Sequence, residues 1–198
     1  MATDNIGKWA AGVSYGPVLS QTDLYLLNTE LEVNPILDNK DENFHLIFNI
    51  STGQTGGFNE NSRDRLLEFT GKDQPATLPR VQQLVIITDI SPWCTIVQNQ
   101  HGITMKDVCT AMWKEYAENL VTHAELDALA PWLQERVKRA ASRNLRRVHF
   151  DDTRSSLPRR VDWLMDRIFF DGLRNDKDYA LARLGFTAPN VFVMHLVP

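Results

Sequence analysis

The stretch QLVIITD (residues 83–89) is a nearly continuous apolar run between polar segments, and it predicts a buried β-strand. The stretch FHLIFNI (residues 44–50) is partly aromatic and β-branched and ends in a polar turn, which is also typical of a strand. The apolar stretches WCTIV (residues 93–97) and VFVMHLV (residues 191–197) predict two more strands. Strands are therefore expected on both sides of a central region with a different pattern.

The central region has the periodicity of helices. Thr104 is placed to accept a hydrogen bond from the first turn of a helix, and apolar residues then recur at positions 105, 108, 112, 116 and 120. Thr122 and Glu125 have the spacing of a reciprocal capping box, which opens a second helical segment. Pro131 falls inside that segment and predicts a break just before it or a kink.

These patterns predict an α+β fold: a single domain with an antiparallel or mixed β-sheet and a layer of helices on one face. Shorter helices are expected over residues 61–69 and 178–184. We assign residues 34–198 to this domain and residues 1–33 to an N-terminal extension, whose packing on the domain is left open. The terminal strand is apolar, and at an edge of the sheet it would pair with a second copy to give a homodimer.

The overall composition narrows the function. The chain has 198 residues, of which 43% are hydrophobic and 23% charged, as in ordinary folded proteins. Its net charge of -4 makes a nucleic-acid partner unlikely, because neutralising phosphates requires an excess of Lys and Arg. No secretory signal and no membrane-spanning segment is recognisable. With two cysteines, Cys94 and Cys109, we expect reduced thiols in an intracellular protein, cytoplasmic or nuclear.

The stretch RVDWL (residues 160–164) is the first candidate for a binding site. Arg160 has a guanidinium that suits an anion, and Trp163 has an indole that suits stacking, with Asp162 beside them. The alternative is architectural: Trp163 covers the core, and Asp162 caps a helix or pairs with Arg160 or Arg147. In that interpretation, residues 157–173 join the helical layer to the closing strands.

A pocket between the sheet and the helices is the second candidate. Its mouth would be lined by Trp93, Trp163, His149, Asp151 and Asp152. Histidine and aspartate are metal-ligand types, but no paired spacing such as His-x-x-x-His or Cys-x-x-Cys accompanies them. We therefore predict no metal centre and no cofactor. No catalytic residue can be assigned, because no nucleophile motif and no carboxylate pair stands out.

Two other segments have the composition of anion sites. The loop STGQTGG (residues 51–57) follows a strand, but it lacks the Gly-Lys-Ser/Thr sequence of a nucleotide-binding loop. The arginine-rich segment from Arg136 to Arg147 is suited to an acidic partner or to phosphates. The simpler interpretation is a solvated helix face whose cations complement the negative end of the helix, and the acidic balance of the chain favours it.

The order of several motifs resembles a known family. NPIL (residues 34–37) precedes the first strand and is followed by QPATLP (74–79), SPW (91–93), GITMKDV (102–108), RVDWL (160–164) and FDGL (170–173). Together these motifs resemble an uncharacterised domain of unknown function that is multiplied in mushroom-forming basidiomycete fungi. The resemblance covers residues 34–197. Members often have Trp-Asp and Arg in the first strand, where this chain has FNIS (48–51), and Trp in the last strand, where it has Phe192 and Val193. The resemblance implies a fold but no catalytic residues.

We therefore predict an intracellular, non-enzymatic interaction or ligand-binding domain, whose partner is an unknown protein or small molecule. The alternative is a small enzyme or a small-molecule-binding protein with its pocket between sheet and helices. An apolar pocket with converging polar groups and a perturbed titratable residue would favour the alternative. A flat surface with an exposed aromatic patch would favour the interaction domain.

Overall fold

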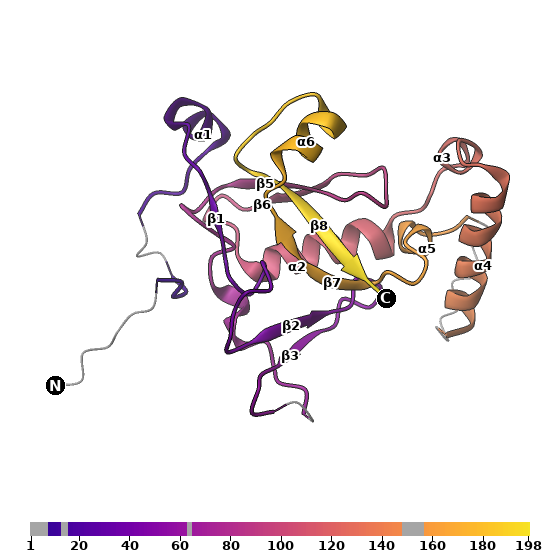
Figure 1. Ribbon diagram of the computed structural model, residues 1–198, viewed down its shortest axis with the longest axis horizontal. Coiled ribbons are helices and arrows are strands. Elements are labelled where there is room, and N and C mark those ends of the chain that lie inside the picture. The colour runs from indigo at the N-terminus through magenta and orange to yellow at the C-terminus, as the bar shows by residue number, and fades with distance from the viewer. Residues whose placement is uncertain (1–7, 13–15, 63–64, 148–156) are drawn as a thin grey trace.

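The computed structural model describes residues 8–12, 16–62, 65–147 and 157–198 (Figure 1). Its largest sheet has four strands in the order β6-β5-β8-β7. These are β5 (Gln83–Ile87), β6 (Thr95–Gln98), β7 (Phe169–Arg174) and β8 (Val191–Val197). β5 and β8 run parallel, whereas β6 and β7 are antiparallel to their neighbours, so the sheet is mixed. The predicted α+β class with a mixed sheet is confirmed.

The remaining elements surround this sheet. Two small antiparallel sheets pair β1 (Glu32–Val33) with β4 (Thr77–Leu78) and β2 (His45–Phe48) with β3 (Thr55–Phe58). The helices are α1 (Gln21–Leu27), the short 3-10 turn η1 (Thr70–Asp73), α2 (Met105–Trp113), the π-helical turn η2 (Lys114–Glu118), α3 (His123–Asp127), α4 (Pro131–Arg147), α5 (Arg160–Trp163) and α6 (Lys177–Leu184). Among the described helices, none combines the length and apolar character that crossing a membrane requires.

The two faces of the sheet are covered by different helices. Alternate side chains of β5 and β8, including Leu84 and Phe192, join the main core, to which α2 contributes Met112. The intervening side chains, including Val193, form a second cluster with Ala180 of α6. Helices were expected on one face of the sheet only. The structure has α2 on one face and α6 on the other. With both faces covered, the inner strands are apolar in almost every position.

The terminal strand β8 lies inside the sheet, between β5 and β7. The expectation that it forms an edge is wrong. Because both of its sides are already paired, β8 offers no free edge through which two copies could pair. β7 takes the edge position, and flanking segments cover part of it: the backbone N–H of Leu173 donates to the carbonyl of Leu37 over 2.7 Å. The oligomeric state stays a prediction.

The local helix signals act as expected. The Thr104 hydroxyl accepts from the backbone N–H of Asp107 over 3.2 Å, and the Asp107 carboxylate accepts from the N–H of Thr104 over 2.9 Å. Thr122 and Glu125 form the same reciprocal pair. The chain breaks before Pro131, which begins α4. The predicted hydrogen bond to Thr104, the capping box at Thr122 and the predicted break are thus confirmed, and the structure adds a capping box at Thr104.

The helix expected over residues 61–69 is absent from the described part of that segment. Instead, Leu67 pairs with Gly57 at the end of the β2–β3 hairpin, with backbone N–H to carbonyl distances of 2.7 and 3.0 Å in the two directions. Extended pairing satisfies the backbone groups that a short helix would have left unpaired at its ends. The N-terminal segment also contributes to the main core, through Leu19, Leu24 and Leu31. Its division from the domain after residue 33 stays a prediction.

Candidate functional site

Three of the candidate residues meet where α5 packs near the segment before β6. The indole rings of Trp93 and Trp163 pack edge to face, with centroids 4.9 Å apart and planes at 68°. The guanidinium carbon of Arg160 lies 4.7 Å from the centroid of the Trp93 ring, within the range of a cation–π contact. The indole N–H of Trp163 donates to the carbonyl of Ile90 over 3.2 Å. We call these three side chains the Trp–Arg cluster.

The charge of Arg160 is neutralised by two helical elements. It forms an ion pair with Glu115 of η2, and its second terminal nitrogen lies 4.0 Å from a carboxylate oxygen of Glu125. The same oxygen of Glu125 accepts from the indole N–H of Trp93 over 2.6 Å. Burial alone would raise the pKa of Glu125, but hydrogen bonds from Thr122 and Trp93 and the charge of Arg160 hold it below its usual value. The carboxylate therefore stays ionised and holds the cluster together at neutral pH.

Asp162 connects α5 to α4. Its side chain is almost fully buried, at 4% exposed. One carboxylate oxygen accepts from the backbone N–H of Arg159 over 2.8 Å, and the other accepts from the amide nitrogen of Asn144 over 2.6 Å. Burial raises the pKa of Asp162, against the opposing effect of these hydrogen bonds and of the Arg159 charge. Asp162 thus caps the start of α5 and ties that helix to α4.

The other predicted pocket residues cannot be placed. His149, Asp151 and Asp152 lie outside the described residues, as does the side chain of Arg147. Within the described ranges, no group of three or more His, Cys, Asp and Glu residues is arranged to hold a metal ion. The candidates that are described, Arg160, Asp162, Trp163 and Trp93, direct their polar groups at neighbouring protein groups. These contacts favour the architectural interpretation of the stretch.

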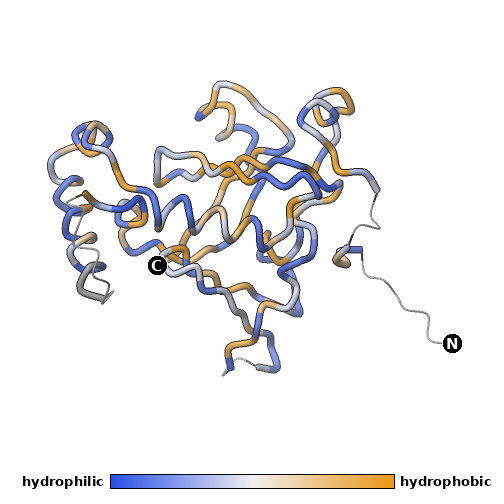
Figure 2. The backbone as a smooth tube through the Cα atoms, turned by 180° about the vertical axis from the view of Figure 1, so that it is seen from behind, coloured by the Kyte–Doolittle hydropathy of each residue, from blue (hydrophilic) through white to orange (hydrophobic). Residues whose placement is uncertain are grey.

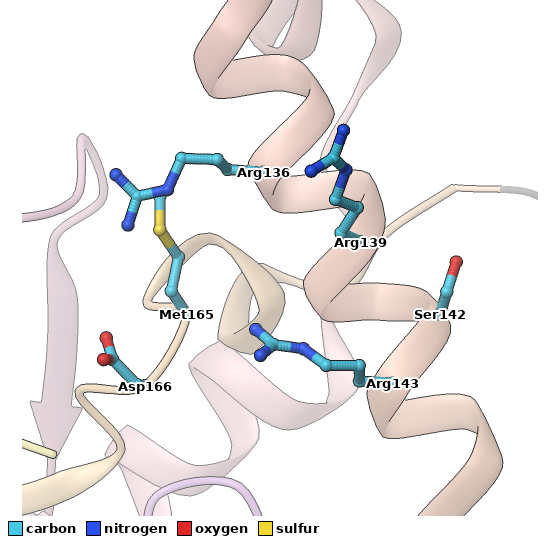
Figure 3. Close-up of a pocket in the computed structure, with 6 residues that line it drawn as sticks. All are labelled: Arg136, Arg139, Ser142, Arg143, Met165 and Asp166. Carbon is cyan, nitrogen blue, oxygen red and sulfur yellow. The ribbon is translucent and has the colours of Figure 1, made fainter.

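A surface cavity of about 510 Å³ lies between α4 and the turn that follows α5 (Figure 3). We call it the arginine groove. One wall is made by side chains of α4 and the other by the turn; the lining residues are Arg136, Arg139, Ser142, Arg143, Met165 and Asp166. The side chains of Arg136 and Arg143 extend from α4 toward the turn (Figure 3). Of the described residues, three arginines and one aspartate thus line the groove.

The sequence of α4 places these arginines side by side. Val137 and Ala140 are buried and hold the helix against the protein. Arg136, Arg139 and Arg143 follow at intervals of three and four residues, so they share one side of the helix. Figure 2 shows α4 at one end of the molecule, coloured mainly as hydrophilic. The amphipathic pattern therefore produces a continuous cationic wall.

The opposite wall depends on an unusual backbone conformation. Met165 has a φ of 61°. This value lies in the left-handed region, which residues other than glycine, asparagine and aspartate seldom adopt. This residue ends the turn of α5, and its N–H donates to the carbonyl of Asp162 over 3.2 Å. The reversal places Met165 and Asp166 opposite α4. Residues in sparsely populated backbone regions cluster at functional sites, so this conformation marks the turn as a candidate wall of a site.

Among the described residues, no carboxylate neutralises the groove arginines as Glu115 neutralises Arg160. Neither Arg139 nor Arg143 forms an ion pair or hydrogen bond with a described residue, and Arg136 contacts the ring of Trp132, 6.0 Å from its centroid. Lys138, on another side of the same helix, lies 3.8 Å from a carboxylate oxygen of Glu135. The described residues therefore concentrate positive charge along the groove.

A family model matches the central part of the chain. The model of a family of unknown function, DUF6699, matches residues 44–179, which is more than half of the chain. The chain belongs to this family. No curated protein and no solved structure matches it. The DUF6699 match includes both the Trp–Arg cluster and the arginine groove, and it brings no activity or residue roles with it.

The sequence pointed to only one wall of the groove in this DUF6699 member. The segment from Arg136 to Arg147 was singled out as suited to an anion, on the basis of its composition. Met165 and Asp166 were missed, because a methionine gives no signal for a left-handed turn. A weak signal was present in the polar pair that follows it, Asp166-Arg167, between two apolar runs.

Proposed function

We propose that this DUF6699 member is an intracellular, non-enzymatic interaction domain whose arginine groove binds an acidic segment of a partner protein. The observation that carries the proposal is the row of Arg136, Arg139 and Arg143, which face one cavity without a carboxylate partner in an ion pair among the described residues. Guanidinium groups bind carboxylates through two parallel hydrogen bonds, so each arginine offers a geometrically defined site.

The length of the groove suits an extended peptide. Arg143 lies seven positions after Arg136, which corresponds to about 10 Å along the helix axis at 1.5 Å per residue. Three residues of extended chain cover about the same distance, at roughly 3.3 Å per residue. An acidic side chain at every third position of a bound segment would therefore meet a guanidinium near each end of the row.

Asp166 supports a protein ligand over a nucleic acid. Its carboxylate stands on the wall opposite the arginines and repels a polymer that carries a phosphate at every step. A peptide can place an amide N–H or a lysine there, because its charges are intermittent. The net charge of -4 of the whole chain acts in the same direction. Binding to nucleic acid through α4 is the competing hypothesis.

The titratable groups in the core support a non-enzymatic role. Burial raises the pKa of Cys109 to about 12 and that of Tyr116 to about 12. Both groups are therefore protonated at neutral pH, and neither is poised as a nucleophile or base. Cys94 is a free and exposed thiol, which suits a reducing intracellular compartment.

We also retain the fungal assignment as a proposal. It is supported by the motifs RVDWL (residues 160–164) and FDGL (170–173), which resemble a family multiplied in basidiomycete fungi. A census of family members by genome tests it, and an even distribution across unrelated lineages would contradict it.

The groove is tested by fluorescence anisotropy with a fluorescein-labelled peptide that has glutamate at every third position and glycine between. We expect the double variant Arg139→Gln/Arg143→Gln to weaken binding about tenfold. Each exposed charge pair contributes about 0.7 kcal/mol to the binding free energy, and losing two pairs costs about 1.4 kcal/mol, which is a factor of about ten in Kd. The matched control is Lys138→Gln/Arg174→Gln, which removes the same charge from positions that do not line the groove. It should retain the affinity of the parent within about twofold.

Two results would contradict the proposal. An equal loss in the control variant would show that the peptide responds to net charge rather than to the groove. Stronger binding of a single-stranded DNA oligomer of equal charge, with affinity that falls steeply with salt, would favour the nucleic-acid hypothesis. Thermal unfolding of each variant shows whether the fold is retained.

A further inference from the structure

A second cavity, of about 350 Å³, lies between α2 and the β2–β3 hairpin. It is separate from the arginine groove, and the two share no lining residue. The α2 side is formed by residues three and four apart, which lie on one side of that helix. The side chains that matter for its chemistry are Phe69, Lys72, Lys106, Cys109, Thr110 and Trp113.

The inner part of this cavity is apolar and rigid. Phe69 is 3% exposed and stacks on Phe44, with ring centroids 5.6 Å apart. Cys109 is buried, and its high pKa keeps it a neutral thiol. Gly53 has a φ of +74°, and a Cβ atom there would lie 3.0 Å from the ring of Trp113. The hairpin backbone therefore packs directly on the indole and fixes this wall.

The cavity also has two cations. Lys72 is partly buried in η1, and Lys106 is exposed on α2. Neither forms an ion pair or hydrogen bond with a described residue. The acid next to Lys106 is already occupied, since the Asp107 carboxylate accepts from Asn99 over 2.7 Å and from Thr104. Two ammonium groups are thus available at a site that also offers the Thr110 hydroxyl.

We propose that this cavity binds a small organic anion with a flat apolar body. The body would lie against Phe69 and Trp113, and its carboxylate would accept hydrogen bonds from Lys72 and Lys106. The volume falls within the range typical of small-molecule sites, about 300 to 1,000 Å³. Apolar walls with a few converging polar groups are the usual composition of such sites. This proposal does not depend on the arginine groove.

Isothermal titration with naphthalene-2-carboxylate and its neutral amide tests the proposal. We expect the carboxylate to bind and the amide to bind about tenfold more weakly, because the amide oxygen still accepts from the ammonium groups but lacks the negative charge that attracts them. Lys72→Gln should weaken carboxylate binding about tenfold and the exposed Lys106→Gln about threefold. Thr110→Phe fills the cavity and should abolish binding of both probes, with thermal unfolding as a check on folding.

Lys114→Gln is the matched control, since Lys114 directly follows α2 and is exposed outside the cavity. It should bind the carboxylate as the parent does. No binding of either probe, equal binding of the carboxylate and the amide, or an equal loss in Lys114→Gln would overturn the proposal. Lys72→Gln should leave binding of the glutamate peptide unchanged, so failure at one site is distinguishable from failure at the other.

Discussion

Replacing Trp163 by alanine is expected to lower the free energy of unfolding by about 3 kcal/mol. Large buried aromatics cost about 3–5 kcal/mol on truncation, and the partial exposure of this indole places it at the lower end. The edge-to-face pair with Trp93 accounts for about 0.5–1.5 kcal/mol, and the hydrogen bond to Ile90 for about 1 kcal/mol. Lost apolar contact with the main core supplies the rest.

Urea unfolding followed by far-ultraviolet circular dichroism measures this change without relying on tryptophan fluorescence. For a domain of this size, about 3 kcal/mol corresponds to a fall of roughly 6–12 °C in Tm. The matched control is Trp132→Ala, because the indole of Trp132 is 63% exposed on α4. That variant should stay within about 0.5 kcal/mol of the parent. A double-mutant cycle with Trp93 isolates the contribution of the ring pair.

One result would refute the architectural interpretation of residues 157–173. If Trp163→Ala unfolds at the same urea concentration as the parent but loses a ligand, the indole is a recognition group rather than part of the junction. The energetic argument above would then fail, because it assumes that the indole's contacts stabilise the fold. The double-mutant cycle would show no coupling between the two rings in that case.

Three further predictions concern buried or constrained groups. Burial raises the pKa of Asp162, so the folded state binds the proton of this carboxyl group more tightly than the unfolded state does. As the pH rises from the usual pKa of 3.8 through the folded pKa, the parent should therefore lose stability relative to Asp162→Asn. Urea unfolding of both proteins across that pH range measures the difference. Gly53→Ala should lower the free energy of unfolding by at least about 1 kcal/mol in thermal melts, because alanine is strained at a positive φ and its Cβ would crowd Trp113. A thiol reagent should modify Cys94 in the native protein and reach Cys109 only after unfolding; fast native modification of Cys94→Ser would contradict this.

The features that the sequence predicted correctly have local causes. The Thr104 acceptor and the capping box of Thr122 and Glu125 depend on a spacing of three residues, which acts within a single turn of helix. Pro131 breaks the chain for a similarly local reason, since its ring and missing N–H exclude it from a helix interior. The main strands were recognisable because their apolar character follows directly from burial.

The features that it missed depend on pairing between distant segments. β7 was not assigned as a strand, because a bulge between Phe170 and Gly172 interrupts the alternation of its side chains. Without β7, nothing distinguished an interior position of β8 from an edge position. The segment 65–69 likewise had the composition of a helix, and its backbone pairing with Gly57 could not be read from the residues themselves. The far wall of the arginine groove was missed for a different, local reason, since Met165 gives no sequence signal for its left-handed conformation.

An arginine can stabilise the fold or bind a ligand, and the structure distinguishes these two roles for arginines that look alike in the sequence. A charge withdrawn from water must be neutralised, because its lost hydration is otherwise uncompensated. Arg160 is in that position, with Glu115, Glu125 and the Trp93 ring around it, and a stabilising role accounts for all of its contacts. Arg139 and Arg143 share one side of α4, where like charges three or four residues apart repel and destabilise a helix slightly. The negative end of the helix favours a cation near it, but it does not require three arginines on one side of α4, whereas an anionic ligand in the groove accounts for all three.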